Sequence, residues 1–353
     1  MIITAESLTE FATRIIAAAG SLAPEAQEVV RHLVEANLKG HDSHGVGMIP
    51  AYVKNVRAGH LRPNTHVTLV SETGSIAVFD GGMGYGQVTA REATEWAIAK
   101  AKATGLGVFT LRNTHHVARV GAYGELAAEA GLISIHFVNV VIAPGRVAPF
   151  GGMTGRFGTD PVCITFPGTD KVPPVVLDFA TSRVAAGKLR VAMNEGKKMP
   201  PGTLLDEQGN DATDPAVFYR ANGSMLPFGE HKGSGLALAC ELFGGMLTGG
   251  GTMQGNIPNH GIKNGMFSIV LDPARFGDMA WMRQEMETLI GWVKSSPPRP
   301  GIDRVMVAGE PERRSREQRL AAGIPVDANT WKELVEAAQL SGVPAAQIPE
   351  GRA

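Results

Sequence analysis

Apolar residues recur at helical spacing through the first part of the chain. Leu8, Phe11 and Ile15 share one face of a predicted helix, and a second amphipathic run follows it. A third amphipathic stretch, at about residues 49–56, comes after the loop sequence HDSHG. The pattern therefore predicts that residues 1 to about 70 form a helical unit.

Beyond about residue 67, short apolar runs alternate with longer amphipathic segments. Six runs predict β-strands, at residues 75–79, 107–111, 132–138, 162–166, 175–179 and 267–271. Helices are predicted between several of them, at residues 87–103, 118–130, 180–192 and 233–248. Alternation of this kind is typical of an α/β domain. After Asp278 the sequence returns to helix, and we expect this tail to pack beside the N-terminal helices.

Composition and charge narrow the class of partner. The 353 residues include 33 basic and 34 acidic side chains, so no overall charge attracts nucleic acid or an acidic membrane. No apolar run approaches the roughly 18 residues that span a bilayer, and the N-terminus does not resemble a secretory signal. Cys163 and Cys240 lie far apart in apolar runs, which fits a reducing cytoplasm. We therefore expect a small-molecule partner, no nucleic acid, no membrane and a cytoplasmic location.

Glycine is unusually abundant, with 44 residues. The segment SIAVFDGGMGYGQVTAREATE is a predicted strand, a glycine-rich turn and a helix, which is the order found at a Rossmann dinucleotide site. The spacing does not fit GxGxxG, because the third glycine would stand at position 87, which is Gln87. These glycines are expected to serve a tight turn and close backbone packing.

The loop HDSH is the first candidate for acid–base chemistry. His41, Asp42, Ser43 and His44 precede a predicted helix, where they could ligate a metal, move protons or cap that helix. The residue types alone leave these alternatives open.

The segment RNTHHVARVGAYGEL is the second candidate, and it places His115 and His116 in the first turn of a predicted helix. A helix N-terminus disfavours a protonated imidazole, so the pKa of these rings would fall and one could exchange a proton near neutral pH. Arg119 lies three residues after His116, on the same predicted helical face, and could bind a carboxylate. Adjacent histidines at a helix start also serve structural roles.

Two later segments add candidate ligand groups. A glycine-rich loop at residues 151–158 precedes Thr159 and Asp160, and such loops either approach a ligand or are ordinary surface loops. Asp178 ends a predicted strand and Thr181 begins a predicted helix. This is the usual place for ligand contacts in α/β sheets, although Asp178 could instead be an N-cap.

The last candidate is Lys232, which follows His231 in a glycine-containing loop before a long apolar helix. A lysine beside a helix N-terminus can bind phosphate. The sequence lacks the GxxxxGK[ST] spacing of a P-loop, so a nucleotide-hydrolysing site is not expected.

Five segments, taken together and in this order, resemble the malate/L-lactate dehydrogenase family of NAD(P)-dependent oxidoreductases, which is unrelated to the Rossmann lactate dehydrogenases. The segments are GHDSHGVGMIPAYV, NTHHVARVGAYGELA, RFGTDP, LDFATS and FGEHKGSGLAL. The likeness covers nearly the whole chain. HDSHGVGMIP and SIHFV most resemble the hydroxycarboxylate dehydrogenase B branch, which reduces 2-oxo acids with NAD(P)H.

The resemblance implies an α/β fold whose non-Rossmann, mixed-sheet NAD(P)-binding domain occupies residues 73–277. It also implies a helical domain made from both chain ends, residues 1–72 and 278–353. The family further implies a homodimer whose active sites lie near the subunit interface.

The resemblance also implies roles for single residues. His116 would be the acid–base residue, with Ser43 and His44 near the nicotinamide and the substrate. The residues implied along the cofactor are His44, Thr159, Asp160, Leu177, Asp178, Thr181, Lys232 and Arg313. Arg313, Arg314 and Arg316 could meet a 2′-phosphate, but the sequence does not decide between NADH and NADPH.

Departures from the family pattern bear on the substrate and on the cofactor pocket. Many members carry an arginine for the substrate carboxylate where this chain has Met48, which argues against small hydroxydicarboxylates and leaves an apolar wall for bulkier side chains. We interpret Arg119 as the replacement carboxylate partner. The usual GTNP is GTDP here, so Asp160 is expected to lack an amide donor.

These expectations combine into an NAD(P)H-dependent reductase of 2-oxo acids that also works in reverse as a 2-hydroxy acid dehydrogenase. His116 would protonate the substrate oxygen as hydride arrives from the nicotinamide. One alternative is a reductase of cyclic imines such as piperideine-2-carboxylate or pyrroline-2-carboxylate. Others are a non-catalytic binding module and a metal-dependent hydrolase using His41, His44, His115, His116 and Asp178.

Overall fold

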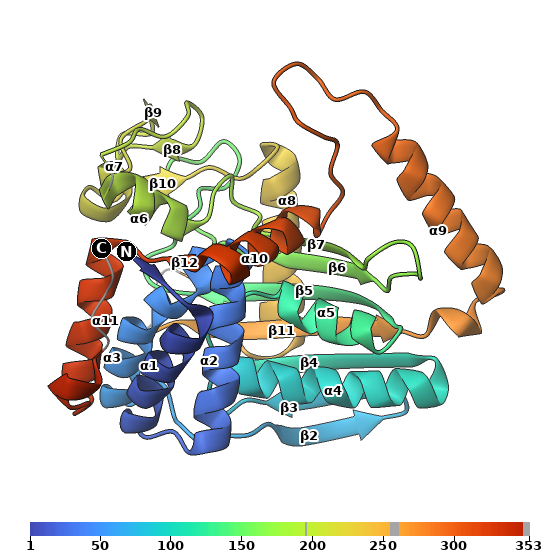
Figure 1. Cartoon of the computed structure of the whole chain (residues 1–353), viewed down its shortest axis with the longest axis horizontal. Coiled ribbons are helices and arrows are strands. Elements are labelled where there is room, and N and C mark those ends of the chain that lie inside the picture. Colours follow the sequence, from blue (N-terminus) through green and yellow to red (C-terminus); the bar gives the residue numbers. More distant parts are fainter. Residues whose placement is uncertain (195, 255–260, 349–353) are drawn as a thin grey trace.

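A seven-stranded mixed sheet forms the middle of the molecule (Figure 1). The computed structural model describes residues 1–194, 196–254 and 261–348. The strands are β2 (Thr68–Thr73), β3 (Ile76–Asp80), β4 (Leu106–His115), β5 (Ile133–Val141), β6 (Val162–Phe166), β7 (Val175–Phe179) and β11 (Lys263–Leu271). Their order is β2-β3-β4-β11-β5-β6-β7, and the pair β3 and β4 is parallel while the other neighbours are antiparallel. A Rossmann sheet is mostly parallel, so the predicted α/β, non-Rossmann fold class is confirmed.

Helices cover both faces of this sheet. On one face, α4 (Gly86–Thr104) packs on β4 and α5 (Gly121–Glu129) packs on β6, with small residues such as Ala93 and Ala97 facing the strands. On the other face lie α8 (His231–Cys240) and the π-helix η3 (Glu241–Leu247). A Cβ on Gly265 would lie 1.9 Å from the carbonyl oxygen of Gly244, so glycine is what lets η3 reach β11.

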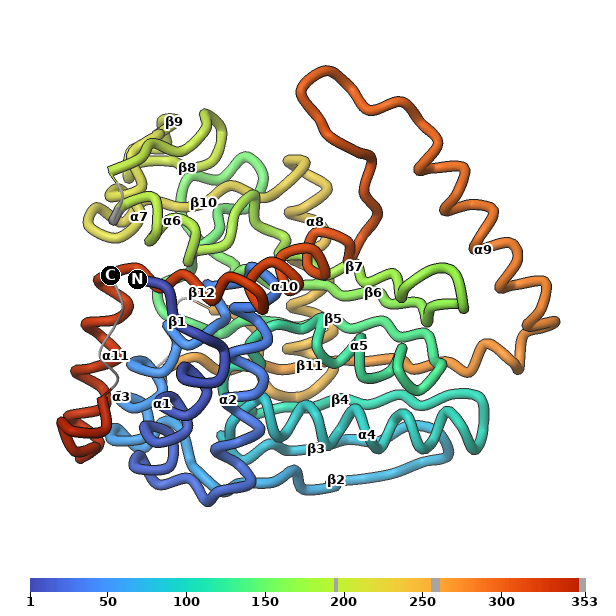
Figure 2. The backbone as a smooth tube through the Cα atoms, viewed as in Figure 1, coloured from blue at the N-terminus to red at the C-terminus, as the bar shows by residue number. Residues whose placement is uncertain are grey.

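The two chain ends build a helical part beside the sheet (Figure 2). Phe11, Leu33, Tyr52 and Leu334 belong to its single apolar cluster, because the predicted amphipathic faces turn inward. The N- and C-terminal strands pair with each other, and α11 contacts α1 and α3. The elements are β1 (Ile2–Ile3), α1 (Ala5–Ala18), α2 (Ala23–Leu38), η1 (Asp42–His44), η2 (Val46–Met48), α3 (Ile49–Arg57), α10 (Glu310–Ala322), β12 (Ile324–Pro325) and α11 (Ala328–Leu340).

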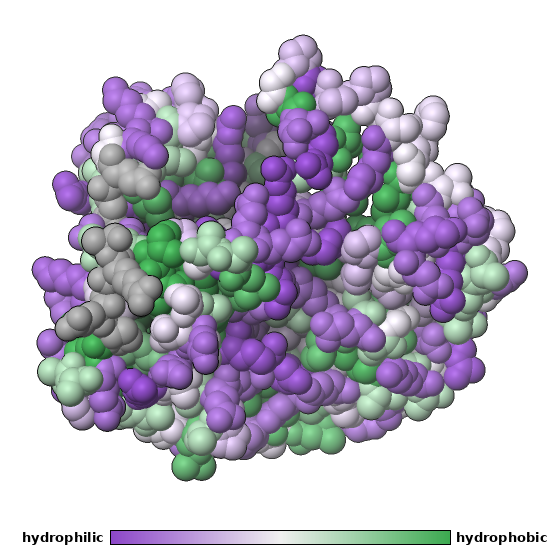
Figure 3. All heavy atoms as spheres, in the orientation of Figure 1, coloured by the Kyte–Doolittle hydropathy of each residue, from purple (hydrophilic) through white to green (hydrophobic). Residues whose placement is uncertain are grey.

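The helix α9 (Met279–Lys294) does not join this helical part. It has no buried residue, and with the loop after it forms an arm that stands away from the sheet (Figure 1). Figure 3 shows a hollow between this arm and the body. The domain boundaries after residues 72 and 277 stay a prediction.

Most of a small third layer was not predicted from the sequence, which indicated only the helix at residues 180–192 there. It holds a three-stranded sheet and two helices around Val147, Leu189 and Phe218. Its strands have only two residues each, too short to show the alternation that identifies a strand. The elements are α6 (Ala186–Asn194), β8 (Leu204–Leu205), β9 (Asp211–Ala212), α7 (Ala216–Arg220) and β10 (Ser224–Met225).

Several predicted boundaries need correction. The strands at residues 162–166 and 175–179 are confirmed to the residue. The helices predicted to begin at residues 118 and 180 begin only at Gly121 and Ala186. The strand β2 was missed because all six of its residues are exposed, which leaves no buried face to produce an apolar alternation.

The glycine-rich turn before α4 serves close packing. A Cβ on Gly86 would lie 2.5 Å from the carbonyl oxygen of His116 and 2.6 Å from that of His115. Only glycine allows the start of α4 to lie against this backbone. The turn that resembles a dinucleotide loop thus supports the strand end that carries the two histidines.

Candidate active site

Two histidines from distant parts of the chain lie in contact. His116 directly follows β4, and His44 is the last residue of η1. Their rings stack with centroids 5.4 Å apart and 17° between the planes. Burial lowers the pKa of His44 to about 4 and that of His116 well below its ordinary value. Neutral imidazoles so placed can exchange a proton with a substrate oxygen.

The surroundings of His116 differ from the sequence prediction. The strand β4 continues to His115, which pairs with Lys263 of β11, and α5 begins only at Gly121. Neither histidine therefore lies in the first turn of a helix, and that prediction is wrong. The low pKa of His116 comes from burial first, and then from the neighbouring His44 and His115.

One ring nitrogen of His116 is held by the protein. The Tyr52 hydroxyl lies 2.7 Å from His116 Nδ1, and Gln87 Nε2 donates to the same hydroxyl at 2.8 Å. No described residue hydrogen-bonds to His116 Nε2, and His44 Nδ1 is buried without a partner in the described part of the chain. These two ring nitrogens are therefore free to bind a ligand.

Arg119 is buried against protein carboxylates. Its guanidinium donates to the two Glu125 oxygens at 2.6 and 3.0 Å and lies 3.7 Å from Asp178. Burial alone would raise the pKa of Glu125, but the hydrogen bonds and charge of Arg119 hold it at about 2. The predicted helical face shared by Arg119 and His116 is wrong, because both precede α5. The guanidinium that was predicted to bind a substrate carboxylate is hydrogen-bonded to Glu125 in the structure.

The carboxyl end of β7 holds two of the predicted cofactor residues. Leu177 is 41% exposed there, which leaves its side chain accessible to a ligand. Asp178 accepts a hydrogen bond from the Gly121 backbone N–H at 2.7 Å. Asp178 of β7 therefore caps the N-terminus of α5. It does not cap the helix that follows β7 along the chain.

Hydrogen bonds of Thr181 join the segment after β7 to the glycine-rich loop and to the segment before α8. Thr181 donates to the Thr159 carbonyl from its backbone nitrogen at 2.9 Å and from its hydroxyl at 3.0 Å. Its own carbonyl accepts from Phe228 N–H at 2.9 Å, so Thr181 does not begin a helix as predicted. Because α8 begins at His231, Lys232 is exposed in the first helical turn, not in a loop.

Asp160 is fully buried, with a positive φ of 36°. Its Oδ1 accepts from the Val140 backbone N–H at 2.9 Å. Burial, and then the nearby Glu241, raise the pKa of Asp160 well above its ordinary value. Asp160 therefore keeps its proton to higher pH than a surface aspartate.

The helix α10 reaches this region from the C-terminal part of the chain. Arg313 Nη1 donates at 2.9 Å to the carbonyl oxygen of Pro174, just before β7. Arg316 donates to Glu35 of α2 at 2.6 Å. Of these two arginines, Arg313 is the one bound beside β7, and Arg316 is engaged by a carboxylate.

The same helix holds the loop that carries Ser43 and His44. Arg319 donates to both carboxylate oxygens of Asp42, at 2.7 and 3.0 Å. His41 Nε2 lies 3.1 Å from Glu312 Oε1. The position of His44 over His116 therefore depends on contacts between the N-terminal loop and α10.

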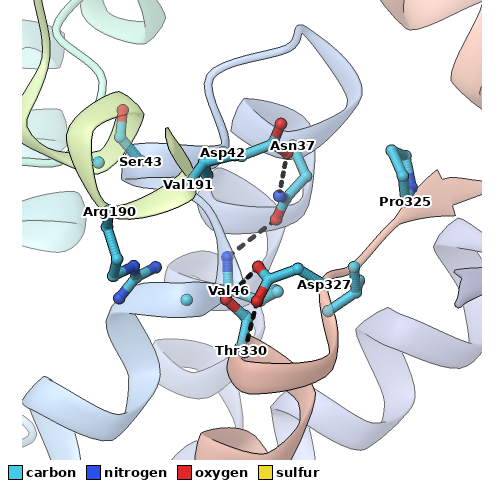
Figure 4. A pocket seen from close by; sticks show the side chains of 12 residues that line it. Asn37, Asp42, Ser43, Val46, Arg190, Val191, Pro325, Asp327 and Thr330 are labelled. Carbon is cyan, nitrogen blue, oxygen red and sulfur yellow. Dashed lines mark hydrogen bonds between the residues drawn. The ribbon is translucent and has the colours of Figure 1, made fainter. Parts of the chain in front are cut away.

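A pocket opens beside η1 and η2 (Figure 4). Arg190 reaches it from α6, and its Nη1 lies 3.7 Å from Glu333 Oε2. Met48 is half-buried and packs against the helical core. Arg190 is not among the residues predicted from the sequence, because a single arginine on a helix carries no signal. The pocket is lined by Asn37, Asp42, Ser43, Val46, Gly47, Gly187, Arg190, Val191, Pro325, Val326, Asp327 and Thr330.

Two negative findings concern the described residues. Within residues 1–194, 196–254 and 261–348, no three His, Cys, Asp or Glu side chains are grouped to hold a metal ion. The hydrolase alternative therefore gains no support from this part of the chain. No helix in these same ranges is long and apolar enough to cross a membrane.

Comparisons with known proteins agree on one family. The family model described as malate/L-lactate dehydrogenase matches residues 3–335. Hydroxycarboxylate dehydrogenase B of Escherichia coli K12 is 43% identical over 96% of this chain and 94% of its own. A solved E. coli structure assigned to the malate/lactate dehydrogenases has a TM-score of 0.94 at 41% identity, covering 99% of this chain and 97% of the other. The Δ1-piperideine-2-carboxylate reductase of Pseudomonas syringae pvar. tomato has a TM-score of 0.81 at 26% identity, covering 96% and 100%.

The burial of several histidines predicts that the folded protein loses stability in mild acid. Burial lowers the pKa of His32, His115 and His136 to about 3, and the pKa values of His44 and His116 are also low. Below about pH 6.5 the unfolded chain binds protons that the native chain does not. The free energy of unfolding should therefore decrease as the pH is lowered, by up to about 1.4 kcal/mol per pH unit for each histidine.

Urea unfolding at several pH values between about 7.5 and about 5.5 measures this slope. His136 lies outside the site, between the hydroxyls of Ser134 and Ser268, so His136→Gln removes one titrating group without touching His116. The variant should have a shallower slope than the parent chain. A parent slope of zero, or an unchanged slope in the variant, would contradict the prediction.

Proposed function

The chain belongs to the malate/L-lactate dehydrogenase family and is an oxidoreductase, and we propose that it reduces 2-oxo acids with NADH or NADPH and oxidises 2-hydroxy acids in reverse. The observation that carries the proposal is the contact between His44 and His116, whose free ring nitrogens have no described protein partner. Proton exchange at a substrate oxygen is what such a reaction needs beside hydride transfer.

The residues around the histidines fit a nicotinamide cofactor on one structural test. A buried polar atom normally has a partner, and His44 Nδ1 lacks one in the described chain. A bound NAD(P)H supplies hydride to the carbonyl carbon of the substrate. We assign its binding to His44, to Thr159 and Asp160 before β6, and to Leu177, Asp178, Thr181, Lys232 and Arg313 at or beside the ends of β7, α8 and α10.

His116 moves the proton in both directions. Its low pKa keeps the imidazole neutral in the free protein, and a neutral ring can take the hydroxyl proton of a 2-hydroxy acid. A 2-oxo acid brings a negative charge, which raises the pKa of an imidazole beside it. The imidazolium then gives its proton to the substrate oxygen as the carbonyl carbon is reduced. His44 and Ser43 would orient the reacting groups.

Met48, at a position where many relatives carry arginine, would contact the side chain of the substrate. We propose that it favours apolar or aromatic 2-oxo acids over dicarboxylates. Arg119 as the carboxylate partner stays a prediction, and a substrate would have to compete with Glu125 for its guanidinium.

The alternative substrate is a cyclic imine, because one structural relative is a piperideine-2-carboxylate reductase. Purified protein should oxidise NADH or NADPH with a 2-oxo acid such as phenylpyruvate, and more slowly with a cyclic imine. The measurement is the loss of reduced cofactor absorbance with each substrate, with and without a chelator. Turnover only with the imine would replace the proposed substrate class, and turnover abolished by the chelator would favour a metal enzyme.

His116→Ala should lower kcat by about a hundredfold to ten-thousandfold, because it removes the proton donor and acceptor. Cofactor affinity, measured by the fluorescence of bound NADH or NADPH, should change little. His66→Ala is the matched control, since this histidine side chain is 71% exposed and its ring contacts Glu92 of α4, not His44 or His116. A nearly active His116→Ala would refute the catalytic assignment.

We also propose that the chain works as a homodimer through the arm built by α9. Trp281, Leu289 and Trp292 fall on one stripe of α9 and are 63%, 58% and 76% exposed. The outer face of η3 exposes further apolar side chains, including Met246 and Leu247. Exposed apolar patches of this extent mark association surfaces.

Trp292→Glu should shift the chain from dimer to monomer in analytical ultracentrifugation, because a charge replaces an apolar contact. Leu22→Glu is the control, since Leu22 is similarly exposed at 67% but precedes α2, away from the arm. A parent chain that is monomeric at micromolar concentration, or a Trp292→Glu variant that stays dimeric, would contradict this arrangement.

We propose a cytoplasmic location on the basis of the two cysteines. Cys163 and Cys240 are both free and buried, as expected of a chain that folds in a reducing compartment.

A further inference from the structure

Arg190 brings a guanidinium to the loop that carries Ser43 and His44. It lies in α6, which packs directly on this loop, because a Cβ on Gly187 would lie only 2.2 Å from Ser43 Cβ. Arg190 comes three residues after Gly187 and therefore shares its face of the helix. Figure 4 shows the side chain extending from α6 toward Val46. The guanidinium thus reaches the loop from the small third layer.

The end of the Arg190 side chain lies against Gly47. A Cβ at that position would lie 2.8 Å from Arg190 Nη2, so a residue without a side chain makes the room that the guanidinium occupies. Ser43 lines the same pocket and directly precedes His44 in the chain. The pocket that holds the guanidinium therefore adjoins the loop position of His44.

The donors of this guanidinium are not used by the described protein. Arg190 Nη1 lies 3.7 Å from Glu333 Oε2, which is beyond hydrogen-bond distance, and the guanidinium makes no hydrogen bond to another described residue. The side chain is 31% exposed, so a small ligand can reach it. Arginine carries its N–H donors in a planar fork that matches the two oxygens of a carboxylate.

Two carboxylates that line the pocket are held by partners of their own. Asp42 accepts from Arg319 at 2.7 and 3.0 Å. Asp327 accepts from the Thr330 backbone N–H at 3.0 Å and from its hydroxyl at 2.6 Å. Neither carboxylate is hydrogen-bonded to Arg190 within the described residues.

The other arginines placed near these loops are engaged. Arg119, Arg316 and Arg319 are each hydrogen-bonded to a protein carboxylate. Among these four arginines, Arg190 is the one whose N–H groups form no hydrogen bond with a described residue. A ligand carboxylate would therefore meet no competing hydrogen bond at Arg190, in contrast to Arg119.

We propose that Arg190 binds the carboxylate of the substrate, so that the neighbouring carbonyl group lies at His116 and His44. A 2-oxo acid carries its carboxylate on the carbon next to the carbonyl, so a cation that holds the first group also orients the second. Arg190 is then the residue that makes the protein select acids over neutral ketones. This inference rests on the proposed function for its catalytic meaning.

Two variants of Arg190 test the assignment in steady-state assays with phenylpyruvate. Arg190→Leu should raise KM about tenfold to a hundredfold, with a smaller change in kcat, because a charge-assisted hydrogen bond to the substrate is lost. Arg190→Lys should have an intermediate KM, since lysine keeps the charge but lacks the planar fork. A KM that stays at the parent value in Arg190→Leu would overturn the proposal.

Arg220→Leu is the matched control. Arg220 is an exposed arginine in the last turn of α7, in the same third layer, and it does not line the pocket. The control variant loses the same charge from the same layer and should keep the parent KM. An equal rise in KM in Arg220→Leu would show a general charge effect and would also overturn the assignment.

Equilibrium binding separates a substrate contact from a structural role. Phenyllactate cannot react with reduced cofactor, so its Kd can be measured on the NADH- or NADPH-bound protein from the cofactor fluorescence. In Arg190→Leu this Kd should rise about tenfold to a hundredfold while the Kd of the cofactor stays unchanged. Equal losses of affinity for the cofactor and for phenyllactate would show that Arg190 only supports the fold.

The same binding data distinguish this inference from the proposed function. A chain that binds phenyllactate through Arg190 but does not reduce phenylpyruvate would refute only the proposed reaction. A chain that reduces phenylpyruvate, with KM and Kd unchanged in Arg190→Leu, would refute only the role of Arg190. A chain that neither reduces phenylpyruvate nor binds phenyllactate would refute both.

Discussion

The buried guanidinium of Arg119 fixes the loop on which the site depends. A charge in the interior is stable only when it is matched, and here Glu125 and the more distant Asp178 match it. Glu125 lies on α5 and Asp178 ends β7, so one side chain joins the loop after β4 to a helix and to a strand. The Arg119 carbonyl oxygen lies 3.2 Å from His32 Nε2 of α2, which adds the helical part. His116, three residues earlier, is therefore placed by contacts from three directions.

The same principle operates at the far end of the chain. Asp42 and Glu312 draw the loop that carries His44 onto α10 through Arg319 and His41. The two histidines thus come from segments that are each held by ion pairs to distant parts of the sequence. A site built in this way requires both chain ends to be folded, and it explains why no local motif is complete by itself.

The sequence predicted best where burial repeats along one element. The strands at 162–166 and 175–179 follow from short apolar runs and the helix α4 follows from its amphipathic pattern, because each places apolar residues in the core of the sheet domain. The sequence predicted poorly where strand pairing outweighs local helix or strand preference. His115 and His116 resemble a helix start in sequence, but β11 supplies hydrogen-bonding partners that extend β4 through His115. The strands of the third layer are too short to repeat any pattern.

The sequence by itself determined the fold class, the family resemblance and the identity of His116 as the acid–base candidate, because residue type and order carry that information. Only the tertiary structure decided what surrounds each group. In the folded chain Arg119 is hydrogen-bonded to Glu125, and Gln87 is hydrogen-bonded to Tyr52. His44 Nδ1 has no described partner. In the sequence, Gln87 stands out only as the residue that breaks a glycine motif. Its contacts lie 35 positions away along the chain, and hydrogen bonds between such distant residues exist only after the chain has folded.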